Sequence, residues 1–366
     1  MAKALDRAMA GHERAVRDGF WLELFEALER ACKLQLAICP SSDAHTEESS
    51  LSEVRRSLKR MYEHLSHGVA FDDFEQVACA QLAIAARAWI KGEAPAYMFD
   101  PESITAGGLQ EWHERYNITV DLPYPPSIIK AIEDFRQGVH GHVAELFEEW
   151  RAHPRKDFDY WIAREREAGR NGILGSVRLY QKSLADRSSL DVYESSGLTR
   201  FMVIVREFQG SGVARATLFD EIGKFLQSPE FQTYPYSRIE TAMWAGVACQ
   251  AANGRKTPPN VGMQNDITVV AALMPYCDAM LVDNECRELL RSIPKKHALG
   301  YKAEVFSPNS GEHFLTYLRG LEATADPGVL ASVREVYGAD WPRPFLTMYE
   351  VDRQRDQRRE SRTSDA

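Results

Sequence analysis

The spacing of apolar residues predicts helix over most of the chain. From Leu5 to about Ala31 the apolar positions recur every three or four residues, as on one face of a helix. The segment 198–210 has β-branched residues that suit a strand, but its length and its flanks favour a helix. Further helical patterns cover residues 52–65, 72–90, 126–153, 159–184, 237–255, 284–293 and 310–321.

Strand patterns occur only near the two ends of the sequence. Leu34, Leu36 and Ile38 alternate with other residues and predict a short strand, which Pro40 and a polar stretch would end. Ser50 and Glu53 have the spacing of a capping box and would open the next helix. Toward the C-terminus, residues 279–282 and 302–307 predict two more strands.

Such short strands are not stable alone, so we expect them to share one sheet. The predicted fold is a three-layer α/β/α core with a short parallel sheet, in a protein that is mostly helical overall. Residues 1–68 and 235–325 would form this core, and residues 69–234 would be a large helical insertion. Residues 326–366 would be a C-terminal extension with a frayed tail.

Composition narrows the class of protein. At 366 residues and 44% hydrophobic composition, the chain can bury a substantial core. Its formal charge of -9 argues against a broad basic surface for nucleic acid, so any contact with nucleic acid must be local. There is no apolar run of about 18 residues and no secretory signal, so we expect a cytoplasmic protein with no membrane partner. The six cysteines lie far apart without a CxxC pair, which predicts free thiols and neither zinc nor disulfides.

Three acidic residues are candidates for metal chemistry. Glu48, Asp266 and Asp283 each lie near the end of a predicted strand or at the start of the next helix. In open α/β sheets that edge is where ligands bind, and carboxylate oxygens are the ligands that Mg²⁺ and Mn²⁺ prefer. Each acid also stands where it could cap a helix, but capping alone does not predict the repeated order of strand, acid and helix.

Four stretches of the sequence resemble the PIN-like nuclease family, specifically a bacterial branch with a Ser-Asp-Ala-His motif. They are PSSDAHTEES at 40–49, NDI at 265–267, PYCDAMLVDNE at 275–285 and YKAEVFS at 301–307. The resemblance implies an α/β/α sandwich and a ribonuclease that depends on Mg²⁺ or Mn²⁺. It also implies that Glu48, Asp266 and Asp283 are the metal ligands. Supporting positions are Asp43, His45, Asn265, Asp278 and Ser307.

The sequence departs from this pattern at its start. The family begins with a strand that supplies a first metal-binding Asp, whereas here only Asp6 and Asp18 precede Leu34, both within helical pattern. Either the start is truncated, or this member has lost catalysis and kept the fold.

Three interpretations remain open at this point, and one of them, a helical scaffold with incidental short strands, would gain if the two groups of strands proved not to share a sheet. The first is a metal-dependent ribonuclease that cleaves single-stranded RNA by a two-metal mechanism. The alternative is a non-catalytic module that binds RNA or a protein on the same fold. In either case the helical insertion would shape access to RNA, or would bind a protein partner or a second copy of the chain.

Overall fold

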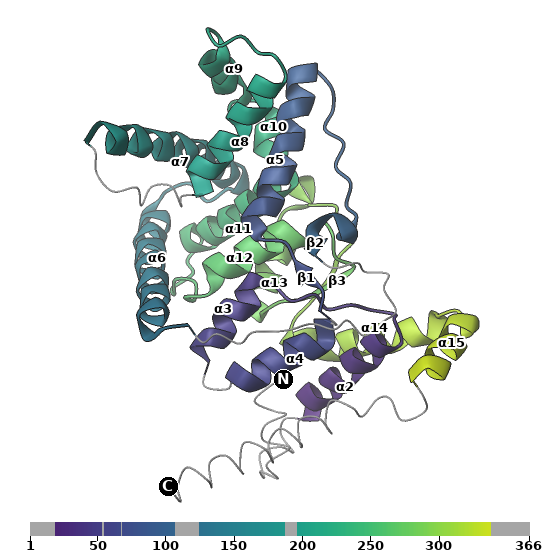
Figure 1. Ribbon diagram of the computed structural model, residues 1–366. Helices are drawn as coiled ribbons and strands as arrows, with labels where there is room; N and C mark the ends of the chain where they lie inside the picture. The colour runs from purple at the N-terminus through teal and green to yellow at the C-terminus, as the bar shows by residue number, and fades with distance from the viewer. Residues whose placement is uncertain (1–18, 53–54, 67, 107–123, 187–195, 338–366) are drawn as a thin grey trace, which may run out of the picture. The chain divides into compact units, whose positions relative to one another are not determined.

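The computed structural model describes residues 19–52, 55–66, 68–106, 124–186 and 196–337, and these are mostly helical with two small sheets (Figure 1). They divide into two compact units. The first takes the described parts of residues 1–71, 105–124 and 309–366, and the second takes residues 72–104 and the described parts of 125–308. Of the segments predicted to form one core, residues 235–308 belong to the second unit and residues 309–325 to the first.

The first unit is built on the pairing of α2 with α14, two helices from opposite ends of the sequence. Phe20 on α2 packs against the start of α14, where a Cβ on Gly311 would overlap its ring. Arg30 on α2 makes a two-pronged ion pair with Glu322 on α14, at 2.6 and 2.5 Å. The elements of this unit are α2 (Gly19–Lys33), α3 (Asp43–Leu51), α4 (Arg55–Ser66), β1 (Ala70–Phe71), β2 (Thr105–Ala106), α14 (Gly311–Thr324) and α15 (Pro327–Tyr337).

The strand predicted at Leu34–Ile38 is wrong. Helix α2 continues to Lys33, and Gln35 then adopts a left-handed conformation with φ of 58°. The backbone N–H groups of residues 36 and 37 both donate to the carbonyl of residue 31, which caps the helix. Leu34 and Leu36 pack with Val333 and Leu330 of α15, so their alternation reflects a helix end packed on another helix.

The polar stretch that was predicted to end that strand instead contains a helix, because residues 43–51 form α3. The Ser42 side chain caps this helix by accepting a hydrogen bond from the His45 N–H. Ser50 lies inside α3, so it does not open the next helix as the capping-box spacing predicted; Glu53 is outside the described residues.

The second unit surrounds helix α11, which packs against α7, α12, α6, α13 and α5 (Figure 1). Small residues let these neighbours approach, and Gly246 faces Leu289 of α13 so closely that a Cβ there would lie 3.4 Å from its side chain. The helices are α5 (Phe74–Lys91), α6 (Pro126–Ala152), α7 (Phe158–Asp186), α8 (Ser196–Gly210), α9 (Leu218–Phe225), α10 (Pro229–Thr233), α11 (Pro235–Ala252), α12 (Met263–Leu273) and α13 (Asn284–Ser292). The prediction of helix for the ambiguous segment 198–210 is therefore confirmed.

The second unit also holds β3 (Ala279–Leu281) and β4 (Glu304–Phe306), as predicted. They pair in parallel, with Met280 opposite Val305. In the first unit β1 and β2 pair antiparallel, and Ser41 adds one isolated bridge to Ala70. The described strands thus form two separate two-stranded sheets, and the prediction that strands from both ends share one sheet is wrong for these residues. No helix within the described ranges combines the length and apolar character needed to cross a membrane.

Candidate functional site

Asp283 stands at the carboxyl end of β3 and begins helix α13. Its Oδ1 accepts a hydrogen bond from the Cys286 N–H at 2.6 Å, so it is the N-cap of that helix. Its other oxygen, Oδ2, lies 3.3 Å from the side-chain amide of Asn260, which also donates to Glu285 Oε2 at 3.2 Å. One oxygen of Asp283 is thus committed to the backbone, and the other faces a group of polar side chains.

Asp266 comes to the same neighbourhood from the first turn of α12. A Cβ placed on Gly262 would lie 3.7 Å from Asp266 Oδ2 and 3.2 Å from Asn260 Oδ1, so these two side chains approach the same point. Burial raises the pKa of the Cys286 thiol, and the negative charges of Asp266, Asp283 and Glu285 raise it further. Three carboxylates therefore gather around Cys286, two of them expected from the sequence.

Three of the supporting positions, Ser307, Asn265 and Asp278, belong to the second unit, and Ser307 and Asp278 lie at opposite ends of the parallel pair β3 and β4. Ser307 follows β4, is buried, and lies at the same edge of the parallel pair as Asp283. Asn265 is half-buried on α12 beside Asp266. Asp278 precedes β3 at the opposite end, where it is exposed and paired with Lys302 at 2.7 Å, so the structure does not bring it to the acidic group.

The donor atoms of this group are carboxylate and amide oxygens, which are the chemistry that Mg²⁺ and Mn²⁺ prefer. Within the part of the chain that the structure describes, however, no group of three or more His, Cys, Asp or Glu side chains is arranged to hold an ion. Glu285 is moreover engaged by Arg255, which also donates to Gln250 at 3.0 Å. The described residues therefore bring two carboxylates, Asp266 and Asp283, and the side-chain amide of Asn260 into one neighbourhood.

Glu48, Asp43 and His45 belong to the first unit, all on α3. Glu48 is exposed in the second half of the helix, not at its start, so the predicted placement next to a strand end is wrong. His45 stacks on the Tyr62 ring with centroids 4.4 Å apart, and its Nδ1 is 3.1 Å from Ser42 Oγ. Burial lowers the pKa of His45 and, helped by the charge of Glu48, raises the pKa of Tyr62 to about 12. These contacts hold the His45 ring against α4 within the first unit.

A polar cavity of about 190 Å³ opens among the helices of the second unit. Its walls come from α7, α8, α10 and α11 and carry charged, hydroxyl and aromatic side chains. The residues that matter for its chemistry are Glu165 and Arg166 on α7, Arg200 on α8, and Glu240 and Trp244 on α11. Neighbouring positions on three separate helices thus converge on one cavity.

The two glutamates of the cavity, Glu165 and Glu240, have pKa values above the usual value of a glutamate. Burial raises the pKa of Glu165 to about 7, with a further contribution from the charge of Glu240 and an opposing one from Arg164. Burial also raises the pKa of Glu240, although Arg200 and a hydrogen bond from the Tyr236 hydroxyl at 3.1 Å favour its charged form. Glu165 can therefore gain or lose a proton near neutral pH.

The cations at this cavity differ in how they are held. Arg200 makes a two-pronged pair with Glu75, at 2.9 and 2.7 Å, and its guanidinium lies over the Tyr236 ring, 4.7 Å from the centroid. Its charge is thus largely compensated. Arg166 Nε is buried and has no hydrogen-bond partner among the described residues.

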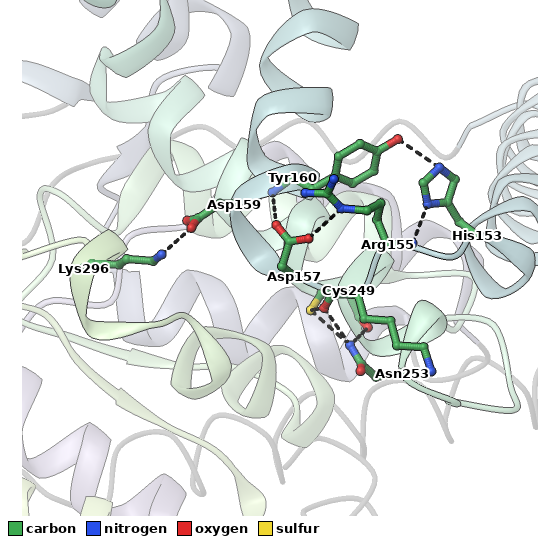
Figure 2. Close-up of polar contacts among 9 residues, drawn as sticks. His153, Arg155, Asp157, Asp159, Tyr160, Cys249, Asn253 and Lys296 are labelled. Carbon is green, nitrogen blue, oxygen red and sulfur yellow. Dashed lines mark hydrogen bonds and ion pairs between the residues drawn. The ribbon is translucent and has the colours of Figure 1, made fainter.

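A second polar cluster holds the turn between α6 and α7 (Figure 2). Asp157 accepts hydrogen bonds from Arg155 Nε at 3.0 Å and from the Tyr160 N–H at 2.9 Å, and these bonds lower its pKa. The Tyr160 hydroxyl lies 2.9 Å from His153 Nε2, and Figure 2 shows these side chains turned toward one another. Each polar group serves a neighbour in the turn, so we assign the cluster a structural role.

The same turn is tied to other elements of the second unit. Asn253 Nδ2 and Cys249 Sγ, both on the α11 side, approach the Lys156 carbonyl at 3.0 and 3.2 Å. Asp159 pairs with Lys296 (Figure 2). It also pairs with His297 at 2.6 Å, and both bonds lower the pKa of this carboxylate.

Sequence reasoning missed Glu285, Asn260 and the cavity residues. Glu285 lies within the stretch that carries the family resemblance, and its position two residues after Asp283 was a usable signal. Nothing in local spacing brings Glu165, Arg200 and Glu240 together, since they lie on three helices. Searches against protein-family models, curated proteins and solved structures find no match to this chain.

Proposed function

We propose that this protein is a metal-dependent ribonuclease with a PIN-like core, which uses Mg²⁺ or Mn²⁺ to cleave single-stranded RNA. The observation that carries the proposal is that Asn260 donates to Asp283 at the carboxyl end of β3, while Asp266 and Asn260 both approach Gly262. Ligands bind at that edge in open α/β sheets. The short motifs that resemble the family contain the same two residues.

In this proposal Asp266 and Asp283 hold the metal through carboxylate oxygens. Asn260 would orient Asp283 through its side-chain amide, as partners of ligating carboxylates do. Glu48 lies in the first unit and is not part of the ligand set proposed here. Bound metal would supply an activated water and would stabilise the charge that develops on the phosphate.

The site needs the metal before RNA can approach it. Asp266, Asp283 and Glu285 present negative charge in a small space, and phosphate would be repelled by them. We therefore expect no RNA binding at this edge in the presence of a chelator, and cleavage only when Mg²⁺ or Mn²⁺ is added.

The test is cleavage of a labelled single-stranded RNA by the full chain in Mn²⁺, in Mg²⁺ and in EDTA. Asp266→Asn and Asp283→Asn each remove one carboxylate charge, and Asn remains a good N-cap at position 283, so that helix is retained. Asp278→Asn is the matched control, because Asp278 lies at the other end of β3. We expect metal-dependent cleavage by the wild type and the control. In both site variants we expect the cleavage rate to fall by roughly 100-fold or more.

Two outcomes would overturn the proposal. Cleavage that survives both site substitutions would place the activity elsewhere or in a contaminant. Metal-independent RNA binding without cleavage by the wild type would favour the non-catalytic module.

A further inference from the structure

Cys32 and Cys39 bring their sulfur atoms to 3.8 Å from each other in the first unit. Cys32 lies in the last turn of α2, and Cys39 follows the chain reversal at Gln35. That reversal is fixed by two backbone hydrogen bonds to the carbonyl of Ala31, of 3.0 and 3.3 Å. The approach of the two thiols is therefore built into the fold of this segment.

We propose that Cys32 and Cys39 are an oxidation site, at which a hydroperoxide converts the two thiols to a reversible disulfide. A disulfide needs sulfur atoms at about 2.05 Å and Cβ atoms at roughly 4 Å. Starting from 3.8 Å, changes in side-chain torsion and in the segment between α2 and α3 that carries Cys39 close this gap. Cys39 belongs to a loop that ends at the Ser42 cap, so it can move without breaking a helix.

The two thiols are not equivalent. Cys32 is buried and donates its S–H to Cys39 Sγ, so its pKa is raised by that bond and by burial. The same hydrogen bond lowers the pKa of Cys39, which is only half-buried. Cys39 is thus the thiol that forms a thiolate more readily.

The reaction balances with a hydroperoxide as the oxidant. The Cys39 thiolate attacks one peroxide oxygen, the O–O bond breaks, and Cys39 becomes a sulfenic acid while the other oxygen leaves as water or an alcohol. The Cys32 sulfur then attacks the Cys39 sulfur, the S–O bond breaks, and the sulfenic oxygen leaves as water. Two thiols lose two electrons and two protons in total, and a dithiol reductant reverses the change.

The sequence offers a direct test, because trypsin cuts after Lys33, between the two cysteines. The native full chain is treated with hydrogen peroxide, the remaining thiols are blocked by alkylation, and the tryptic peptides are analysed by mass spectrometry. We expect the peptides bearing Cys32 and Cys39 to be joined, and dithiothreitol to separate them. The other four thiols of the chain are internal controls, which we expect to stay at least ten-fold less oxidised.

Single variants identify the attacking thiol. In Cys32→Ser, Cys39 has no partner, and we expect a sulfenic acid that reacts with dimedone; in Cys39→Ser we expect little reaction at Cys32. The wild-type mapping needs neither variant, so it decides the matter even if a variant fails to fold. Absence of the joined peptides at a peroxide concentration that oxidises half of any other thiol overturns the proposal.

Discussion

Replacing Glu165 with glutamine should change how the stability of the second unit depends on pH. The pKa of Glu165 is raised from 4.5 to about 7 by burial in the polar cavity and by the charge of Glu240. The native state therefore binds this proton more tightly than the unfolded chain does, and stability must fall as the pH rises from about 4.5 to about 7. The stabilising contribution is fully present below the unfolded pKa and is lost as the pH passes through the folded pKa.

The magnitude follows from the size of the shift. A shift of about 2.5 units at roughly 1.4 kcal/mol per unit gives about 3 kcal/mol between acid and alkaline limits. Glutamine keeps the shape and carries no charge, so Glu165→Gln should be more stable than wild type at pH 8 by about 3 kcal/mol, and by less than about 1 kcal/mol at pH 5.

The assay is urea unfolding followed by tryptophan fluorescence at these two pH values, since Trp244 lines the cavity. Subtracting the wild-type free energy of unfolding at each pH removes the titration of other groups. Glu167→Gln is the matched control, because Glu167 is an exposed glutamate on the same helix. An equal effect of Glu165→Gln at pH 5 and pH 8 would refute the reasoning. Glu240→Gln supplies a further check, since removing that charge should lower the pKa of Glu165.

Two more predictions concern the first unit, and both are measured by thermal or urea unfolding of the full chain. Gly311→Ala should destabilise the protein by about 1 to 3 kcal/mol, because the new methyl group would overlap the Phe20 ring of α2. Gly320→Ala on the same helix is the control, since the new methyl group there meets open space and should be neutral or stabilising. Equal effects of the two substitutions would contradict the packing argument. Glu29→Ala should cost about 3 kcal/mol, because Glu29 is buried and its carboxylate lies 2.9 Å from His64 Nε2 and 3.5 Å from Lys33 Nζ, so the variant loses both contacts. The exposed Glu26→Ala on the same helix is its control and should change stability by less than about 0.5 kcal/mol.

The helices that the sequence predicted correctly are those whose apolar residues recur at helical spacing over several turns. The segment 198–210 formed a helix despite its β-branched residues, because four of its apolar positions are buried on one face, and packing on α5 and α7 overrode the local preference. Strands β3 and β4 were predicted from short apolar segments. For β3 the end of the strand was also clear, because Asp283 caps the helix that follows it.

The errors have a common physical cause. Leu34 and Leu36 alternate with the period of a strand. The same spacing arises where the chain reverses direction at the end of α2, and both side chains then pack on α15. The polar stretch at 43–51 has a weak apolar face, so only the Ser42 cap and contacts with α4 reveal it as a helix. Short patterns of this kind do not distinguish between the two structures.

The sequence by itself determined the helical character, the parallel pair β3 and β4, and the placement of Asp266 and Asp283 at the starts of two helices, because these depend on residues close together in the chain. Only the tertiary structure decided that Glu285 and Asn260 join those acids, that Cys32 faces Cys39, and that Glu165 meets Glu240. The two residues of the last pair are 75 positions apart in the sequence. Protonation of a buried carboxyl depends on what surrounds it in space, and that is fixed by packing.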